Sequence, residues 1–318
     1  MERIVTYSPA YTLVPTYECF NRCSYCNFRV APGEDEWMSL DAARKRLRSL
    51  QTQDVVEILI LSGEVHPRSP RRSAWLKRIY DLCAIALDMG FLPHTNAGPL
   101  SFEEMAQLRE VNVSMGLMVE QVSPKLMETV HAHAPSKQPQ VRLQQLEFAG
   151  QLQIPFTTGL LLGLGESEND WRESLDAIAC SHRQYGHIQE VILQPHQPGQ
   201  RQQEVRSPCH GRTLLRAVTL ARQILPADIT LQIPPNLIRS ETALLACLDA
   251  GVRDLGGIVP KDEVNPDYTH RSHSATTDLL QQHGWKLQPR LPVYPQYIEW
   301  LSLFLQQVCR KRAERNAV

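Results

Sequence analysis

The chain has 318 residues, enough to bury one large hydrophobic core and a usual length for a single barrel domain. Its 33 basic and 34 acidic residues give a net charge of −1, so nothing in the composition indicates a nucleic-acid surface or a membrane-binding face. The amino-terminal segment has no basic region followed by an apolar core, and no apolar run approaches the length of a membrane span. We therefore expect a cytoplasmic protein with neither nucleic acid nor membrane as a partner.

The hydrophobic pattern predicts repeated β–α units, because short apolar runs rich in β-branched residues alternate with longer segments of helical period. The predicted strands are residues 11–15, 55–61, 91–95, 112–118, 155–162, 188–194, 229–233 and 252–256. The predicted helices are residues 40–52, 74–89, 102–110, 140–152, 169–184, 211–224, 238–250 and 275–283. Eight pairs predict an α/β fold, a (β/α)8 TIM-type barrel, with residues 1–318 forming a single domain that includes a carboxyl-terminal extension. A doubly wound sheet is the alternative, but its glycine loop should follow the first strand, where this chain has cysteines.

Three cysteines lie close together in the loop after the first predicted strand. Cys19, Cys23 and Cys26, in the run TYECFNRCSYCNF, are separated by three and then two residues. Thiolates at this spacing can bind three corners of a four-iron cluster, which leaves one iron open for a small molecule to bind and react. Structural zinc is the weaker alternative, because it needs a fourth ligand at close spacing and the nearest later candidate is His66. The remaining cysteines are expected to be buried or incidental thiols, and they are Cys83, Cys180, Cys209, Cys247 and Cys309.

The cysteine motif, with Tyr25 directly before the last cysteine, resembles the signature of radical S-adenosylmethionine enzymes. Further segments, among them PHTNAGPL, SMGLMVE and DLGGIVPKDEVNPDY, resemble one family in this group, subunit 1 of 7,8-didemethyl-8-hydroxy-5-deazariboflavin synthase. The resemblance implies a [4Fe–4S] cluster on the three cysteines and S-adenosyl-L-methionine on its open iron, with Tyr25 in the cofactor site. It also implies an electron donor such as flavodoxin or ferredoxin, because a reduced cluster cleaves S-adenosylmethionine to methionine and a 5′-deoxyadenosyl radical.

The segment SGEVHP follows the second predicted strand, at the end of the barrel where catalytic residues collect. Gly63 is a common turn residue, but it would also let the backbone approach a ligand closely. Glu64 places a carboxylate beside the cysteine loop. By resemblance, these two residues form the glycine–glutamate motif that meets the amino group of S-adenosylmethionine, with Ser62 where the family usually has a first glycine.

Polar residues also follow the third and fourth predicted strands. The family-like run PHTNAGPLSFEEM leads us to expect that His94, Thr95 and Asn96 face the pocket and that Ser101 begins a helix. The fourth strand ends at Glu120, and an acidic side chain there can accept both hydroxyls of a ribose. An exposed glutamate at a helix start is the alternative. By resemblance, Glu120 binds the ribose of S-adenosylmethionine.

The segment after the fourth strand contains two histidines and an arginine. His131 and His133 could form a metal-binding pair, but no third ligand is nearby, so we expect solvated or hydrogen-bonded loop histidines. Composition alone predicts that Arg142 lies on the surface of a helix. The resemblance instead implies that Arg142 binds the carboxylate of S-adenosylmethionine, for which a planar guanidinium is suited.

The fifth predicted strand contains Gly159, Gly163 and Gly165, which weaken a strand unless its backbone must lie close to another group. A phosphate-binding loop is not favoured, because no lysine followed by serine or threonine comes after them. By resemblance, this run packs along the adenine and methionine parts of the cofactor, and Glu166 caps the next helix.

The sixth strand departs from the family pattern, because Gln194, Pro195 and His196 stand where Gln-Asn-Phe is usual. Residues 254–268 match the family again and are rich in glycine, proline and aspartate. We expect the part of this run that follows the eighth strand to form a long loop that closes the mouth of the barrel over a substrate.

The predicted function is that of a radical S-adenosylmethionine carbon–nitrogen lyase. By resemblance, its small-molecule substrate is a hydroxybenzyl–uracil adduct, 5-amino-5-(4-hydroxybenzyl)-6-(D-ribitylimino)uracil, which a companion radical enzyme subunit supplies. Hydrogen abstraction, ring closure, loss of ammonia and oxidation would give the deazaflavin. The alternatives are the companion subunit itself, which joins tyrosine to ribitylamino-uracil, a menaquinone-pathway relative, a more remote hydrogenase-maturation or biotin-synthase-like enzyme, and a non-catalytic zinc-binding scaffold. The sequence does not identify the acid or base, for which His66, His94 and His196 are candidates.

Overall fold

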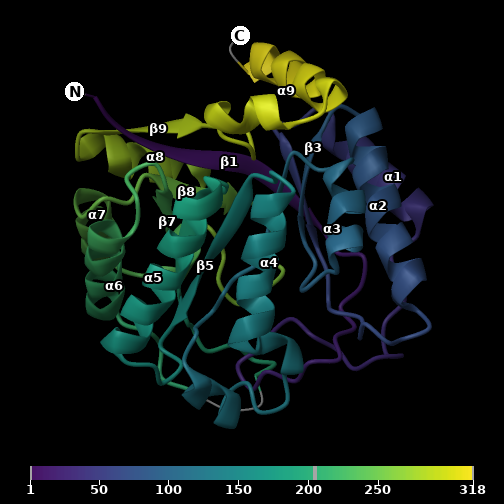
Figure 1. The fold of residues 1–318 in the computed structure, drawn as a ribbon. Helices are drawn as coiled ribbons and strands as arrows, with labels where there is room; N and C mark the ends of the chain where they lie inside the picture. The colour runs from purple at the N-terminus through teal and green to yellow at the C-terminus, as the bar shows by residue number, and fades with distance from the viewer. Residues whose placement is uncertain (1, 203–205, 317–318) are drawn as a thin grey trace.

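Eight parallel strands close into a barrel at the centre of the molecule (Figure 1). The structure is a computed structural model, which describes residues 2–202 and 206–316. Each strand pairs with the next, and β1 pairs with both β2 and β8, which closes the barrel. The predicted α/β TIM-type fold is confirmed. The strands are β1 (Arg3–Leu13), β2 (Glu57–Leu61), β3 (Leu92–Asn96), β4 (Ser114–Gly116), β5 (Phe156–Leu162), β6 (Ile188–Pro195), β7 (Thr230–Gln232) and β8 (Asp254–Ile258).

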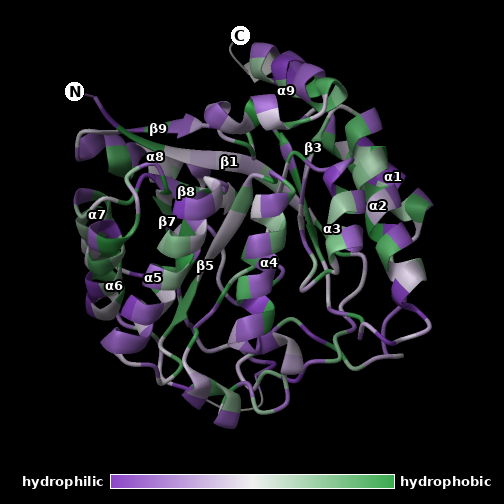
Figure 2. Cartoon of the chain, in the orientation of Figure 1, coloured by the Kyte–Doolittle hydropathy of each residue, from purple (hydrophilic) through white to green (hydrophobic). Residues whose placement is uncertain are grey.

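Helices follow the strands and surround the barrel. In α1 the buried residues are Ala43, Leu47 and Leu50, whose spacing of four and three residues places them on one face. Figure 2 shows hydrophobic and hydrophilic residues interleaved along the helices, as expected where one face packs on strands and the other meets solvent. Ser101 begins α3 with a capping box, as predicted. The helices are α1 (Leu40–Leu50), α2 (Arg72–Asp88), α3 (Phe102–Arg109), α4 (Pro139–Gln151), α5 (Glu168–Tyr185), α6 (Gly211–Ile224), α7 (Glu241–Asp249) and α8 (His273–Gln282).

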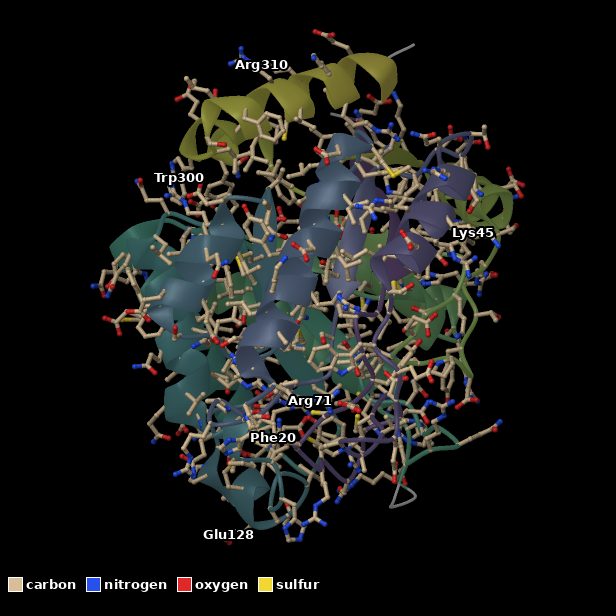
Figure 3. The ribbon with its side chains drawn as sticks, turned by 90° about the vertical axis from the view of Figure 1, so that its right-hand side faces the viewer. Phe20, Lys45, Arg71, Glu128, Trp300 and Arg310 are labelled. Atoms are coloured by element: carbon tan, nitrogen blue, oxygen red, sulfur yellow. The ribbon has the colours of Figure 1, made fainter. Side chains whose placement is uncertain are left out.

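The carboxyl-terminal segment closes the end of the barrel opposite the cysteine loop. Strand β9 (Trp285–Pro289) pairs with the first half of β1, and α9 (Leu303–Asn316) follows it. In Figure 3, Trp300 and Arg310 lie at one end of the molecule, whereas Phe20 of the cysteine loop and Glu128 lie at the other. The carboxyl ends of the strands therefore open toward the cysteine loop, and their amino ends are covered.

The predicted boundaries agree with the observed ones to within a few residues, except at β1. This strand begins at Arg3 and not at residue 11, and it ends at Leu13. Pro9 lies within it, close to the point where the ladder with β8 shifts register, so its missing N–H is tolerated. Sequence reasoning also omits β9, a five-residue strand in which apolar and polar residues alternate but only Trp285 is buried.

None of the helices in the described part of the chain combines the length and apolar composition needed to cross a bilayer.

All eight cysteines are described, and all are free thiols. Cys83, Cys209, Cys247 and Cys309 are buried, as expected for thiols outside a disulfide framework, whereas Cys180 is exposed.

Candidate active site

The cysteine loop leaves β1 at the carboxyl end of the barrel and lines a cavity of about 210 Å³. Cys19, Cys23 and Cys26 all contribute to the wall of this cavity. Burial raises the pKa of Cys19 to about 11 and that of Cys23 to about 12, so these thiols would release protons on binding a metal. The loop is fixed by backbone hydrogen bonds, among them Arg22 N to His133 O at 2.8 Å.

The three cysteine side chains line one cavity but are not gathered around a single metal ion. Within residues 2–202 and 206–316, no group of three His, Cys, Asp or Glu side chains is arranged to hold a metal ion. Three thiolates on the wall of one cavity are nevertheless a donor set suited to three corners of a cluster that fills the cavity. The fit of a cluster therefore rests on the spacing of the cysteines and on their shared cavity.

Glu64, at the end of β2, lies at the centre of a hydrogen-bonded group beside the cysteine loop. Its Oε2 accepts from Asn21 Nδ2 at 2.8 Å and from the hydroxyl of Ser136, and its Oε1 pairs with Arg142 Nη2 at 3.3 Å. Gly98 is needed here, because its φ is +82° and a Cβ atom would lie 2.3 Å from Cγ of Glu64. Glu64 is thus held toward the cavity by three different segments of the chain.

Glycine is required at position 63 because another backbone segment lies close to it, and not only because a ligand could approach there. A Cβ atom at this position would lie 2.2 Å from the carbonyl oxygen of Glu18, and Gly63 N donates to Thr16 O at 2.8 Å. Gly63 also lines the cavity. The close backbone approach seen here is to the segment that begins the cysteine loop, so Gly63 sets the distance between that loop and the end of β2.

Glu120 and Lys137 form a buried ion pair on another side of the cavity. Glu120 has a φ of 67°, an uncommon conformation for a residue other than glycine, and its N–H donates to Gly159 O at 3.0 Å. Burial acts to raise the pKa of Glu120, but Lys137 and Arg142 together hold that pKa below its usual value. The carboxylate is therefore ionised and is turned into the site.

Arg142 is buried, with 2% of its surface exposed, so the composition-based prediction of a surface position is wrong. Its Nε donates to Ser136 O at 2.8 Å and its Nη1 to Met118 O at 3.3 Å, and these carbonyls replace the water that a surface arginine would have. Arg142 lines the same cavity as Glu64, Glu120 and Lys137. Sequence reasoning missed Lys137, because its short segment Pro135–Lys137 gives no signal beyond one lysine in a loop.

Tyr25 lines the cavity and is hydrogen-bonded to His131, with 3.0 Å between the hydroxyl oxygen and Nε2. Burial raises the pKa of Tyr25 and lowers that of His131 to about 3, so both groups are neutral. His131 is buried and hydrogen-bonded, whereas His133 is exposed. The loop interpretation of these two histidines is confirmed.

A second cavity, of about 190 Å³, extends from the first into the barrel. The two cavities share lining residues, which are Leu61, Asn96, Met118, Gln194 and Val264. His94 and Asn96 line the inner cavity, as expected, but Thr95 does not. Because side chains alternate along β3, Thr95 points outward and bonds to Asn112 at 2.8 Å.

The departure in the sixth strand lies mostly outside the two cavities. Gln194 lines both of them, but among the described residues Pro195 and His196 line neither. Pro195 pairs with Leu162 at the end of β6, and His196 N continues that pairing by donating to Leu162 O at 2.8 Å. His66, the remaining candidate acid or base, packs its ring against Phe20 and lines neither cavity.

The loop after β8 lines the inner cavity, whereas its closure over a substrate stays a prediction. Its residues 262–265 are part of the cavity lining. Glu263 accepts from the Tyr17 hydroxyl at 2.7 Å, and Asp262 accepts from Asn236 Nδ2 at 2.8 Å. The loop is thus tied both to the cysteine-loop segment and to the loop after β7.

The prediction that Glu166 caps the helix after β5 is wrong. Ser167 is the N-cap of α5, and it forms a capping box with Asp170. Glu166 instead turns back and accepts from the backbone N–H groups of Gly163 at 2.6 Å and Leu164 at 2.7 Å. Its carboxylate stabilises the glycine turn at the end of β5.

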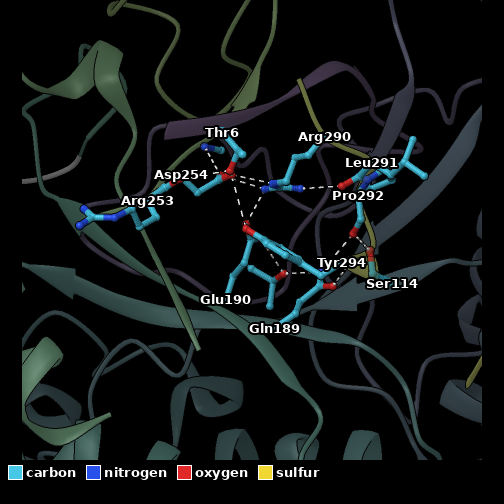
Figure 4. A network of polar contacts seen from close by, with 12 residues as sticks. Thr6, Ser114, Gln189, Glu190, Arg253, Asp254, Arg290, Leu291, Pro292 and Tyr294 are labelled. Atoms are coloured by element: carbon cyan, nitrogen blue, oxygen red, sulfur yellow. Dashed lines mark hydrogen bonds and ion pairs between the residues drawn. The ribbon is translucent and has the colours of Figure 1, made fainter. Parts of the chain in front are cut away.

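A charged cluster forms the floor of the inner cavity (Figure 4). Arg290 donates to both carboxylate oxygens of Asp254, at 2.6 and 2.9 Å, and pairs with Glu190. The hydroxyl of Tyr294 donates to Glu190 at 2.8 Å. Burial raises the pKa of Glu190 to about 8, against the opposing effect of Arg290. Sequence reasoning missed this cluster, because its members are far apart in the chain.

Comparisons with known proteins agree with this site. The family model of the Radical SAM superfamily matches residues 13–178, which include the cysteine loop and Arg142. The 7,8-didemethyl-8-hydroxy-5-deazariboflavin synthase of Trichormus variabilis is 64% identical over 98% of this chain and 92% of its own length. The enzyme of the same name from Synechocystis sp. is 63% identical over 95% of this chain and 97% of its own length.

A solved structure adds evidence on the fold alone. The [FeFe]-hydrogenase maturase HydG from Carboxydothermus hydrogenoformans superposes with a TM-score of 0.76, covering 98% of this chain and 78% of its own, at 16% identity. The relatives of high identity extend over nearly the whole chain, including the segments that line the inner cavity. The chain therefore belongs to the radical S-adenosylmethionine superfamily and, within it, to the 7,8-didemethyl-8-hydroxy-5-deazariboflavin synthases, enzymes of deazaflavin synthesis that use a [4Fe–4S] cluster and S-adenosylmethionine.

Proposed function

We propose that this enzyme is the subunit 1 type of deazariboflavin synthase, a carbon–nitrogen lyase. It converts the adduct 5-amino-5-(4-hydroxybenzyl)-6-(D-ribitylimino)uracil to the deazaflavin with loss of ammonia. The observation that carries this proposal is the pair of adjoining cavities, one lined by the three cysteines and the other lined by polar side chains deeper in the barrel. A polar substrate in the inner cavity would lie directly beside a cofactor in the outer one.

The residues around the outer cavity suit the cofactors in charge and in chemistry. Cys19, Cys23 and Cys26 would hold the cluster, which with S-adenosylmethionine supplies a 5′-deoxyadenosyl radical that removes a hydrogen atom from the substrate. Tyr25 and Gly63 would form part of the wall against the cofactor. These roles are supported by the shared cavity.

The two ion pairs in the wall of the outer cavity are suited to the amino, carboxylate and ribose groups of S-adenosylmethionine. Glu64 pairs with the guanidinium of Arg142, and Glu120 pairs with the ammonium group of Lys137. Both carboxylates are therefore hydrogen-bond acceptors that could also bind donor groups of the cofactor. Glu64 would accept from the amino group, Glu120 from the ribose hydroxyls, and Arg142 would donate to the carboxylate. Anaerobic titration of Glu120→Ala tests this assignment, and an unchanged affinity for S-adenosylmethionine would overturn it.

The remaining partners follow from the same reaction. We propose that a companion radical enzyme makes the adduct from tyrosine and ribitylamino-uracil, and that flavodoxin or ferredoxin reduces the cluster in the cytoplasm. The loop of residues 262–265, which lines the inner cavity, would help to exclude water while the substrate is bound.

A choice between two substrate sets tests the proposed reaction. Reduced enzyme with S-adenosylmethionine is incubated anaerobically with the adduct, or with tyrosine plus ribitylamino-uracil, and products are identified by mass spectrometry. The proposal predicts deazaflavin, ammonia and 5′-deoxyadenosine from the adduct and no adduct from tyrosine. If tyrosine and ribitylamino-uracil were joined instead, the chain would have the activity of the companion subunit.

A further inference from the structure

His94, on β3, lies in the wall of the inner cavity and is held by a short hydrogen-bonded chain. Its Nδ1 is 2.7 Å from the hydroxyl oxygen of Ser114, and that hydroxyl is 2.6 Å from the carbonyl oxygen of Pro292. Both interactions are buried, and Ser114 and Pro292 come from β4 and from the segment after β9. Figure 4 shows Ser114 and Pro292 side by side next to the charged floor of the cavity.

These two hydrogen bonds determine which ring nitrogen of His94 carries the hydrogen. A serine hydroxyl has one hydrogen, and a carbonyl oxygen can only accept, so the hydrogen of Ser114 is directed to Pro292. The Ser114 oxygen is then an acceptor toward His94, and Nδ1 must be the donor. In a neutral ring, Nε2 is left as the nitrogen with a free lone pair.

Nε2 of His94 lies beside Gly116 in the wall of the inner cavity. A Cβ atom placed on Gly116 would lie 2.9 Å from Nε2, so a side chain at that position would cover this nitrogen. Gly116 itself lines the same cavity. The absence of a side chain at Gly116 therefore leaves the lone pair accessible to a molecule in the cavity.

Burial, together with the charge of Arg290, keeps the His94 ring neutral. Burial, followed by repulsion from Arg290, lowers the pKa of His94 to about 3. The other titratable groups of the cavity wall are the carboxyl groups of Glu57 and Glu190 and, from the loop after β8, the side chains of Asp262, Glu263 and His270. Arg290 is itself paired with Glu190 and Asp254. At neutral pH, His94 is thus a hydrogen-bond acceptor with a fixed tautomer.

We propose that His94 binds the substrate, accepting through Nε2 a hydrogen bond from a neutral N–H or O–H donor, and that Ser114 positions His94 by fixing its tautomer. The inference rests on the proposed function, because the occupant of the inner cavity is taken to be the hydroxybenzyl–uracil adduct. That molecule has three rigid donors of this class, the two ring N–H groups of the pyrimidine, N1–H and the imide N3–H, and the phenol O–H.

Variants at the two positions test the binding role. His94→Phe should lower kcat/KM for the adduct by roughly fivefold to hundredfold, mainly through KM, because a substrate donor loses its partner. His94→Gln, which can place a carbonyl oxygen near the position of Nε2, should recover part of the loss. Ser114→Ala should weaken substrate binding without a direct contact, whereas Ser114→Thr, which keeps the hydroxyl, should not. An unchanged KM in both His94→Phe and Ser114→Ala would overturn the proposal.

Three substrate analogues identify the donor. Methylation of N1, of the imide nitrogen N3 or of the phenol oxygen should weaken binding to the wild-type enzyme for the group that meets Nε2. The same methylation should weaken binding to His94→Phe much less, because the hydrogen bond is already lost there. Equal losses of affinity in both proteins for all three analogues would overturn the proposal, because none of these donors would then bind His94.

The tautomer and the charge are measured without turnover. In cluster-containing protein labelled with 15N-histidine, NMR should show Nδ1 of His94 protonated and Nε2 unprotonated from pH 6 to 8, and Ser114→Ala should change this pattern. A ring protonated on Nε2 would overturn the proposal. If the wild-type enzyme did not convert the adduct at all, the proposed function would fail, whereas the tautomer would remain testable by NMR.

Discussion

Replacing Arg290 with methionine should strongly destabilise the fold, because the guanidinium is the partner of two buried carboxylates. Glu190 is 3% exposed and Asp254 is fully buried, and Arg290 donates at least three hydrogen bonds to them. Removing one partner of a buried ion pair typically costs about 3–5 kcal/mol. Because Arg290 serves two carboxylates, we expect a loss of unfolding free energy near the upper end of that range, about 5 kcal/mol.

The assay is anaerobic urea unfolding of the cluster-containing protein, followed by far-UV circular dichroism. Arg216→Met is the matched control, since Arg216 pairs with Glu168 on the surface and should contribute no more than about 1 kcal/mol. At pH 8, adding Glu190→Gln to Arg290→Met should restore part of the lost stability, because glutamine needs neither a counter-charge nor a bound proton at this buried position. A loss in Arg290→Met no larger than that in the control would refute the reasoning.

The pH dependence provides a second check on the same cluster. The pKa of Glu190 in the folded protein, about 8, is above its usual 4.5, so the folded state binds its proton more tightly than the unfolded state. The stability that this group contributes is therefore fully present below about pH 4.5 and is lost as pH rises toward 8. The loss of unfolding free energy in Arg290→Met should accordingly be smaller at pH 5 than at pH 8. An equal loss at the two pH values would mean that ionisation of the floor carboxyl groups does not determine the effect of the substitution.

Three further outcomes are expected at the outer cavity. Cys26→Ala should lose the four-iron cluster, whereas Cys180→Ala, at an exposed cysteine outside the site, should keep full iron and sulfide content; retention in both would contradict the cluster assignment. Arg142→Ala should weaken S-adenosylmethionine binding by roughly tenfold to hundredfold in anaerobic titration, and unchanged affinity would exclude a direct contact. Gly98→Ala should lower that affinity while keeping the iron content, because a Cβ atom would collide with Glu64 at 2.3 Å; normal affinity would show that the orientation of Glu64 is unimportant.

The barrel could be predicted from the sequence because its signals are local. Strand β5, buried at every position, contains no charged residue and ends in three consecutive leucines, and α6 repeats buried residues with helical period. The spacing of Cys19, Cys23 and Cys26 is likewise contained in one short loop. Each of these features is determined by neighbouring residues and needs no knowledge of the tertiary structure.

The rest depends on residues that only the fold brings together. Arg290 and Glu190 are 100 residues apart, and a lone arginine after the last barrel strand gives no sign of a buried pair. The burial of Arg142 could be inferred only from the family resemblance, because its position in α4 is compatible with a solvated face. The start of β1 could not be predicted, because half of its pairing is with β9, a strand that is itself mostly exposed.

The central claim, that this chain completes the deazaflavin from the hydroxybenzyl–uracil adduct as a carbon–nitrogen lyase, is tested most directly by isotope tracing. Adduct labelled with 15N at its 5-amino group is incubated anaerobically with reduced enzyme and S-adenosylmethionine, and ammonia, deazaflavin and 5′-deoxyadenosine are quantified together. The account predicts labelled ammonia and unlabelled deazaflavin in equal amounts, with 5′-deoxyadenosine formed in step with them. Formation of 5′-deoxyadenosine only at the rate seen without substrate, with no labelled ammonia, would contradict it.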